Sequence, residues 1–250
     1  MSVLLRFVAL YALMYAAFGV SSPFMPPFFK ERGLTPEQLG LLFGAGTAIR
    51  LASGPLVGRL ADLTQALRTA LAGCEAQAAI VAVGLLWPSS FTPLLLISLV
   101  PAAALAPTTA LADALALSAA QPRERPRFEY GWVRGTGSAF FVIGTLASGQ
   151  LVEDRGLASI IVFQAALLAG AAGAATLLPK PESSPRKAVT DRAPPSGVVT
   201  LLALLILVSG RLYGALNARG FLVMALLCAA VPPLAWRLYA VDARVNSGQR

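Results

Sequence analysis

The sequence consists largely of apolar runs, each about 18–25 residues long and separated from the next by a short polar connection. A helix of that length crosses the hydrocarbon core of a bilayer. No water satisfies backbone N–H and C=O groups there, so a spanning segment must be a helix or part of a closed barrel. Barrel strands are about 10 residues long and alternate in polarity. These runs are longer and do not alternate, which predicts an all-α membrane protein.

Charge and composition exclude several other classes. Charged residues make up 13% of the chain, against about 25% in soluble domains. The net charge is +8, but the basic residues lie in connections rather than on a face interleaved with aromatic residues. We therefore interpret this charge as topogenic and expect no nucleic-acid partner. The chain has no histidine, and its two cysteines lack metal-ligand spacing, so we expect neither a metal site nor a cofactor.

Prolines and charged turns divide the first part of the chain into six predicted helices. Their expected ranges are 4–29, 35–62, 69–87, 92–119, 130–152 and 157–178. Pro23, Pro26 and Pro27 should kink or end the first helix. Thr35 suits the cap of the second helix, and Pro36 suits its first turn.

The rest of the chain differs in composition. Residues 179–197 are rich in Pro, Ser, Lys and Arg and predict a solvated linker. Two more apolar segments follow within 198–240, and a polar tail covers 241–250. We therefore expect a six-helix N-terminal bundle at 1–178, a cytoplasmic linker, about two further transmembrane helices and a tail.

The distribution of Lys and Arg predicts the orientation. One side of the membrane would carry Arg68, Arg123, Arg125, Arg127, Lys180, Arg186, Lys187, Arg192, Arg244 and Arg250. The other side would carry Lys30, Arg32, Arg155, Arg211 and Arg219. Because the more basic side faces the cytoplasm, we expect a multi-pass protein of the inner (plasma) membrane with both termini in the cytoplasm.

Glycine spacing predicts where helices approach closely. The pairs Gly40/Gly44, Gly54/Gly58 and Gly131/Gly135 each fit a small-xxx-small pattern. Such pairs also arise by chance in helices rich in Ala and Gly, so this indication is weak.

A short motif ends the second predicted helix. Residues 58–62 read Gly-Arg-Leu-Ala-Asp, and Arg68 follows six residues after Asp62. This segment resembles the signature loop of the major facilitator superfamily, although residues 63–67 lack the basic residues usual there. The resemblance implies a conformational-switch loop formed by Gly58, Asp62 and Arg68. The alternative is that Asp62 only ends a helix in water.

Further segments narrow the resemblance. Three segments are similar to the phenylpropionate-transporter subgroup. They are residues 28–35 with 38–40, the Asp-Ala-Leu-Ala-Leu of 113–117, and the Tyr-Gly-Trp-Val-Arg of 130–134 with Gly137 and Ser138. That subgroup belongs with the lactose and nucleoside proton symporters. The likeness covers about residues 5–178 and implies proton-coupled uptake of a small organic solute, such as an aromatic acid or a sugar-like molecule.

The number of helices departs from this family. Major facilitator transporters have two six-helix halves, and alternating access rocks one half against the other. Residues 209–237 resemble the family's last helix pair, so the chain reads as a shortened transporter with about four helices missing. A monomer would then lack an opposing wall, which a homodimer would supply. Rival interpretations are a non-transporting membrane scaffold or a deletion remnant; a membrane enzyme is disfavoured, because no nucleophile–base arrangement is present.

Four charged residues fall inside the predicted helices at similar depth: Arg50, Glu75, Asp113 and Arg134. Intramembrane charges are costly and usually face a bundle interior or an aqueous cavity. They could form a buried ion-pair network, act as a proton- or substrate-linked switch, or lie in part at the interface. Arg50 or Arg134 could also bind a substrate carboxylate, because a guanidinium matches its geometry.

Aromatic residues recur at helical spacing in the first helix, as Tyr11, Tyr15 and Phe18 together with Met14. These side chains could pack against the protein core or lipid, or they could form a wall that faces the substrate.

Overall fold

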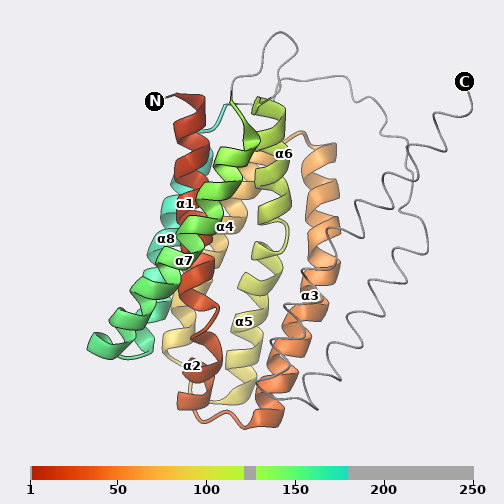
Figure 1. Ribbon diagram of the computed structural model, residues 1–250. Coiled ribbons are helices and arrows are strands. Elements are labelled where there is room, and N and C mark those ends of the chain that lie inside the picture. The colour runs from red at the N-terminus through yellow and green to blue at the C-terminus, as the bar shows by residue number, and fades with distance from the viewer. Residues whose placement is uncertain (1, 121–127, 180–250) are drawn as a thin grey trace, which may run out of the picture. The chain divides into compact units, whose positions relative to one another are not determined.

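The computed structural model describes residues 2–120 and 128–179, and these ranges contain eight α-helices and one short 3-10 helix (Figure 1). In chain order they are α1 (Val3–Ser21), α2 (Met25–Glu31), α3 (Pro36–Leu63), α4 (Leu67–Val83), η1 (Gly84–Leu86), α5 (Phe91–Leu105), α6 (Thr108–Ala120), α7 (Tyr130–Arg155) and α8 (Ala158–Thr176). The predicted linker, the two helices within 198–240 and the tail lie outside the described residues.

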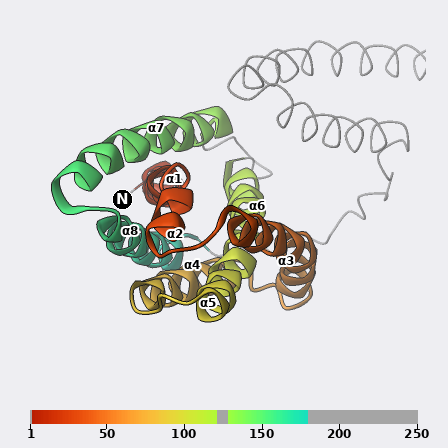
Figure 2. The same cartoon turned by 90° about the horizontal axis from the view of Figure 1, so that it is seen from below.

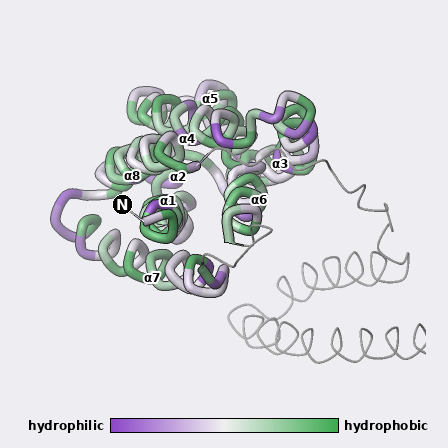
Figure 3. The backbone as a smooth tube through the Cα atoms, turned by 90° about the horizontal axis from the view of Figure 1, so that it is seen from above, coloured by the Kyte–Doolittle hydropathy of each residue, from purple (hydrophilic) through white to green (hydrophobic). Residues whose placement is uncertain are grey.

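Six segments of the described chain are long and apolar enough to cross a membrane. They are Val3–Ser21, Pro36–Leu63, Leu67–Leu86, Phe91–Ala120, Tyr130–Arg155 and Ala158–Thr176. Each overlaps one of the six predicted ranges, so the prediction of six spanning helices is confirmed. Figure 3 shows the same pattern, with hydrophobic colour along the helices and a hydrophilic turn between α7 and α8.

Prolines break two of the predicted helices. The first predicted helix is divided into α1, which ends at Ser21, and the short α2. Pro26 and Pro27 lie in the first turn of α2, so the predicted interruption is confirmed. The fourth was predicted to run through Pro107, but α5 ends at Leu105 and α6 begins at Thr108. Proline has no N–H and clashes with the preceding turn, which accounts for this break.

The start of α3 confirms the predicted cap. The Thr35 hydroxyl accepts from the Gln38 N–H at 3.3 Å, and Gln38 Oε1 accepts from the Thr35 N–H at 3.0 Å. This reciprocal capping box satisfies two backbone donors that the first turn would leave unpaired.

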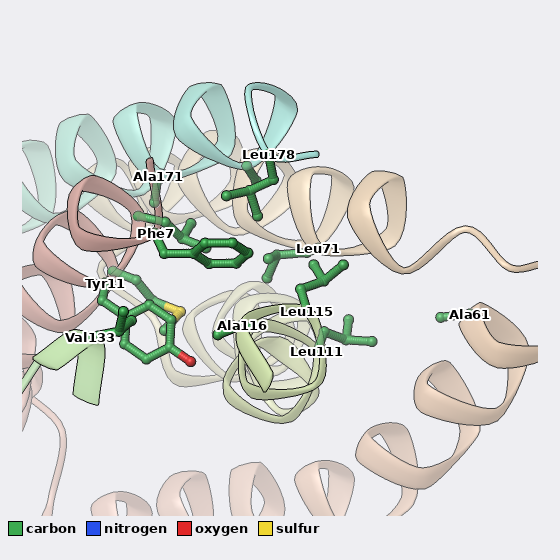
Figure 4. Close-up of a cluster of buried hydrophobic side chains, with 14 residues drawn as sticks. Phe7, Tyr11, Ala61, Leu71, Leu111, Leu115, Ala116, Val133, Ala171 and Leu178 are labelled. Atoms are coloured by element: carbon green, nitrogen blue, oxygen red, sulfur yellow. The ribbon is translucent and has the colours of Figure 1, made fainter. Parts of the chain in front are cut away.

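The centre of the bundle is α1, which packs against both α7 and α8 (Figure 2). Its Phe7, Leu10, Tyr11 and Met14 have no exposed surface. Side chains from α4, α6 and α8 complete this hydrophobic cluster, as Figure 4 shows. The aromatic stripe of the first helix is therefore partly core.

Glycines allow α1 and α7 to approach closely. A Cβ added to Gly19 would lie 2.1 Å from the Phe141 carbonyl oxygen, and one added to Gly144 would lie 2.5 Å from that of Ala16. Thr145 Oγ1 also donates across this contact to the Gly19 carbonyl at 3.0 Å. Only glycine fits at these two positions.

The glycine pairs predicted from spacing have a different environment. A Cβ at Gly40, Gly44, Gly54, Gly58 or Gly135 would meet nothing within 4 Å. These glycines make no close helix contact within the described bundle, because small-xxx-small spacing does not determine which face of a helix meets a neighbour.

Helix α3 is the least covered of the spanning helices. It buries only Leu42 and Ala61, whereas Leu51, Leu56 and Leu63 are each more than two-thirds exposed. Large apolar side chains exposed in this way suit contact with lipid or with another helical bundle.

Two arginines bind the carboxyl end of α8. Arg6 Nη1 donates to the Leu177 carbonyl and Arg68 Nη1 donates to the Leu178 carbonyl, each at 2.9 Å. The last carbonyls of a helix have no partner inside it, so these bonds satisfy groups that need one. We call this end, where α1 begins, the amino end of the bundle (Figure 1).

Candidate functional site

A polar network surrounds Asp113 on α6. Tyr11 of α1 donates its hydroxyl to Asp113 Oδ1 at 2.5 Å, and Tyr130 of α7 donates to the same oxygen at 2.7 Å. Arg134 of α7 has its Nη1 at 3.6 Å from this oxygen. Two phenol donors and a guanidinium thus hold the carboxylate, and three helices meet on it.

Arg134 also binds Tyr15 of α1. Its Nη1 donates to the Tyr15 hydroxyl, and its guanidinium carbon lies 5.1 Å from the centre of the Tyr15 ring. A Cβ added to Gly137 would lie 2.9 Å from that ring, so this glycine makes room for it. The structure therefore brings together Asp113 and Arg134, two of the four predicted intramembrane charges.

Sequence reasoning missed Tyr130 as a member of this network. Its signal was its position four residues before Arg134, which places both on one face of α7. Tyr11 and Tyr15 had been noted only as an aromatic stripe, and the structure gives their hydroxyls polar partners on α6 and α7.

A cavity of about 640 Å³ lies farther from the amino end. Residues of α1, α2, α3, α4, α5, α6, α7 and α8 line it. Four of its lining residues are phenylalanines: Phe18, Phe29, Phe43 and Phe141. Hydroxyl or amide groups come from Ser21, Ser22, Thr47, Ser98, Thr109 and Gln164.

Arg50 is the single charged residue among those that line the cavity. It lies in the middle of α3, and it has no hydrogen bond or ion pair with any of the described residues. Of the two partners predicted for Asp113, Arg134 and Arg50, the described residues show Arg134. A guanidinium in a cavity lining that contains no acidic residue is a group that an anionic solute can neutralise.

The network lies next to the cavity, on the side of the amino end. Phe18 and Thr109 line the cavity, and Tyr15 and Asp113 follow them toward that end by about one helical turn on α1 and α6. The edge-on contact of Tyr15 and Phe18, with ring centres 5.7 Å apart, links the two regions directly. The ion pair therefore lies about one helical turn from the cavity lining, toward the amino end.

Glu75 on α4 stands apart from the other predicted charges. Its side chain has no exposed surface, and neither carboxylate oxygen has a hydrogen-bond partner in the described bundle. Among the described residues, the ion-pair network considered above therefore joins Asp113 to Arg134 and does not include Glu75.

The predicted switch loop lies at the amino end. Asp62 is exposed in the last turn of α3, and Gly58 lies one turn earlier with open space around its Cα. Arg68 is turned toward α8 by its bond to the Leu178 carbonyl. The switching role of these three residues remains a prediction.

Comparison with known proteins places these features in a family. The chain matches the profile of the MFS_1 like family over residues 4–205. It is 32% identical over 148 residues to the Escherichia coli (strain K12) protein named "Probable 3-phenylpropionic acid transporter", and 29% identical over 151 residues to "Uncharacterized transporter YwbF" of Bacillus subtilis (strain 168).

These alignments cover 59% and 60% of this chain but only 38% and 37% of the two relatives. No solved structure matches the chain. The profile match covers most of the sequence and agrees with the six spanning helices. The chain is therefore a multi-pass membrane protein that belongs to the MFS_1 like family of major facilitator transporters.

Proposed function

We propose that this bundle is one half of a proton-coupled carrier that takes up a small aromatic carboxylate across the inner membrane, with the amino end in the cytoplasm. The observation that carries the proposal is the cavity, whose lining includes four phenylalanines and one guanidinium, that of Arg50. Aromatic rings offer stacking surfaces to an aryl group. Arg50 offers paired N–H donors that match a carboxylate.

The lining favours a carboxylate over a sugar-like solute. A sugar needs many polar partners around its hydroxyls, and the cavity contains no carboxylate that could accept from them. An aryl carboxylate has one apolar and one anionic end, which fits the composition of the wall. Its binding would also supply a counterion for Arg50, which has none among the residues that the structure describes.

The charge of such a solute is a physical reason for proton coupling. Moving one negative charge into a cell against an inside-negative potential costs about 2.3 kcal/mol per 100 mV. Carrying one proton with each carboxylate makes the step electrically neutral, so the potential no longer opposes uptake.

The Asp113–Arg134 pair suits a conformational switch in this scheme. Alternating access requires contacts that hold one state and break in the other. The pair joins α6 to α7 beneath the cavity, and Tyr11 and Tyr15 connect it to α1. We propose that the switch loop of Gly58, Asp62 and Arg68 closes the same end.

A second bundle completes the cavity wall in this proposal. The exposed leucines of α3 suit such a contact, and a second copy of this chain is one source of it. The rival function is a membrane scaffold that transports nothing, and it predicts neither solute binding nor uptake.

Calorimetric titration of the purified chain with 3-phenylpropionate tests the proposal. Arg50→Gln should weaken binding at least 10-fold, because it removes the charge-assisted pair, which is worth about 1.5–3 kcal/mol. Arg59→Gln, on the same helix but outside the cavity, is the matched control and should bind like the wild type. The neutral amide 3-phenylpropanamide should bind weakly to all three proteins.

Uptake is measured in liposomes under an imposed proton gradient, with the oligomeric state determined in the same preparation. Accumulation of labelled 3-phenylpropionate by the wild type supports the proposal. Absence of both binding and uptake, or binding unaffected by Arg50→Gln, would contradict it.

A further inference from the structure

The strongest unexplained feature of the bundle is Glu75. It is a carboxylic acid with no exposed surface, and both of its oxygens lack a hydrogen-bond partner among the described residues. An ionised carboxylate is very costly in an apolar interior unless it is paired, so such a group is stable there as the neutral acid.

The helices that pack against α4 offer Glu75 no counterion. The described parts of α8, α5 and η1 contain no ionisable side chain at all. The only ionisable group of α6 is Asp113, which carries the same charge as an ionised Glu75 and is already bound by Arg134.

The remaining helices that contact α4 are α1 and α3. The ionisable residues of α1 are Arg6, Tyr11 and Tyr15, which bond to the Leu177 carbonyl, to Asp113 and to Arg134. The ionisable residues of α3 are Glu37, Arg50, Arg59 and Asp62, and those of α4 besides Glu75 are Arg68 and Cys74. Arg50 lies on the cavity, and Arg68 is bound to the end of α8. None of these groups forms a hydrogen bond or an ion pair with Glu75.

A thin layer of small side chains separates Glu75 from the cavity. Ala82 lines the cavity, and Glu75 lies seven residues earlier on nearly the same face of α4, about 10 Å toward the amino end. Between them Ala78 and Ala79 pack with Ala104 and other small or apolar residues of α1 and α8. Small side chains of this kind can separate through a modest shift of the helices.

Asp113 differs from Glu75 in having polar partners. Two phenol hydroxyls donate to one of its oxygens, and a guanidinium lies beside it. Its side chain is also partly exposed, whereas Glu75 is fully buried. The two acids therefore have opposite surroundings.

We propose that Glu75 is a proton-binding site separate from Asp113, and that it carries the coupled proton. The second statement rests on the proposed function. In the conformation described, the proton is bonded to a carboxyl oxygen of Glu75. When the alanine layer parts, that O–H bond breaks, the electron pair stays on the carboxylate and the proton passes to water; reprotonation on the other side reverses the step. Asp113 stays paired with Arg134.

Infrared spectroscopy of the full-length purified chain tests the first statement without any solute. The wild type should show the C=O stretch of a protonated carboxylic acid at neutral pH, and this band should shift in D₂O. Glu75→Gln should lose the band, and Glu75→Asp should restore one. Glu153→Gln, which alters an exposed acid in the last turn of α7, is the matched control and should keep the wild-type band.

A glutamine has nearly the shape of a protonated glutamate, so Glu75→Gln should purify in normal yield. A band that persists in Glu75→Gln, or one that does not respond to D₂O, would overturn the proton site. If Glu75→Gln does not fold, Glu75→Asp decides, because its band should move in frequency from that of the wild type.

Liposome transport tests the second statement. Glu75→Gln should still exchange labelled for unlabelled 3-phenylpropionate, but it should lose accumulation driven by a proton gradient. Accumulation equal to that of the wild type would overturn the carrier role. If the wild type itself moves no aromatic carboxylate, the proposed function and the carrier role both fail, while the infrared band still decides whether Glu75 binds a proton.

Discussion

Tyr11 and Asp113 are joined by a 2.5 Å hydrogen bond between residues 102 positions apart in the sequence. Tyr11 has no exposed surface, so water cannot replace this donor if it is lost. The bond connects the central helix of the bundle to the acid of the polar network around Asp113, and it makes this network part of the core.

Replacing Tyr11 with phenylalanine should therefore destabilise the bundle. A hydrogen bond to a charged group is worth about 1.5–3 kcal/mol, and this should appear as a lower free energy of unfolding in detergent. Tyr130→Phe is the comparison, and its effect should be smaller because Tyr130 is partly exposed. Equal losses for the two variants would contradict the role of burial.

A double-mutant cycle tests the pairing of Asp113 with Arg134. Their side chains are 29% and 45% exposed, so the coupling free energy should be about 1 kcal/mol, as for partly screened pairs, rather than the value of a buried pair. Asp113→Asn and Arg134→Gln should each lower stability, and the double variant should recover part of the loss. Strictly additive losses would exclude the pair.

The glycine contact between α1 and α7 predicts a specific steric effect. Gly144→Ala places a Cβ 2.5 Å from a carbonyl oxygen, so the helices must separate at a cost of about 1–3 kcal/mol. Gly149→Ala, on the same helix with nothing within 4 Å, is the matched control. It should be neutral or slightly stabilising, because alanine is the better helix former. Thermal unfolding of both variants makes the comparison, and equal midpoints would refute the contact.

The two arginines at the amino end should protect the last turn of α8. Without Arg68 the Leu178 carbonyl loses its partner, so Arg68→Gln should speed amide hydrogen exchange there, and Arg6→Gln should act similarly through Leu177. Arg59→Gln changes an exposed arginine of α3 and should leave this exchange unchanged. Protection that survives both Arg6→Gln and Arg68→Gln would show that the bonds do not hold the helix end.

The proposed orientation places the amino end in the cytoplasm. Alkaline phosphatase fused after residue 190 or at Arg250 should be inactive, and the same enzyme inserted at Gly156 should be active, because it folds only outside the cytoplasm. High activity of the first two fusions would reverse the orientation.

The spanning helices were predictable because the length and polarity of each run are local properties. The prolines near residue 25 also act locally, and so does the capping box at Thr35. The break at Pro107 was underestimated, since apolar sequence continues on both sides of it. The linker and the two later helices stay predictions.

The site was only partly predictable because side-chain partners depend on how the helices are rotated. Equal depth correctly suggested Asp113 and Arg134 as partners. The similar depth of the four charged residues in the membrane also suggested partners for Glu75. However, α4 packs mainly against α5 and α8, which contain no ionisable residue. In the same way, glycine spacing predicted close helix packing at α3, whereas the close contact lies between α1 and α7, at Gly19 and Gly144.

The position of α1 at the centre of the bundle has a consequence for biosynthesis. Helix α1 is synthesised before α7 and α8, the two helices that it mainly packs against, and Arg6 bonds to a carbonyl 171 residues later. Contacts of such long sequence separation form only after the intervening chain has been made. Tyr11 and Gly19 of α1 therefore remain without their partners on α6 and α7 until those later helices have been made.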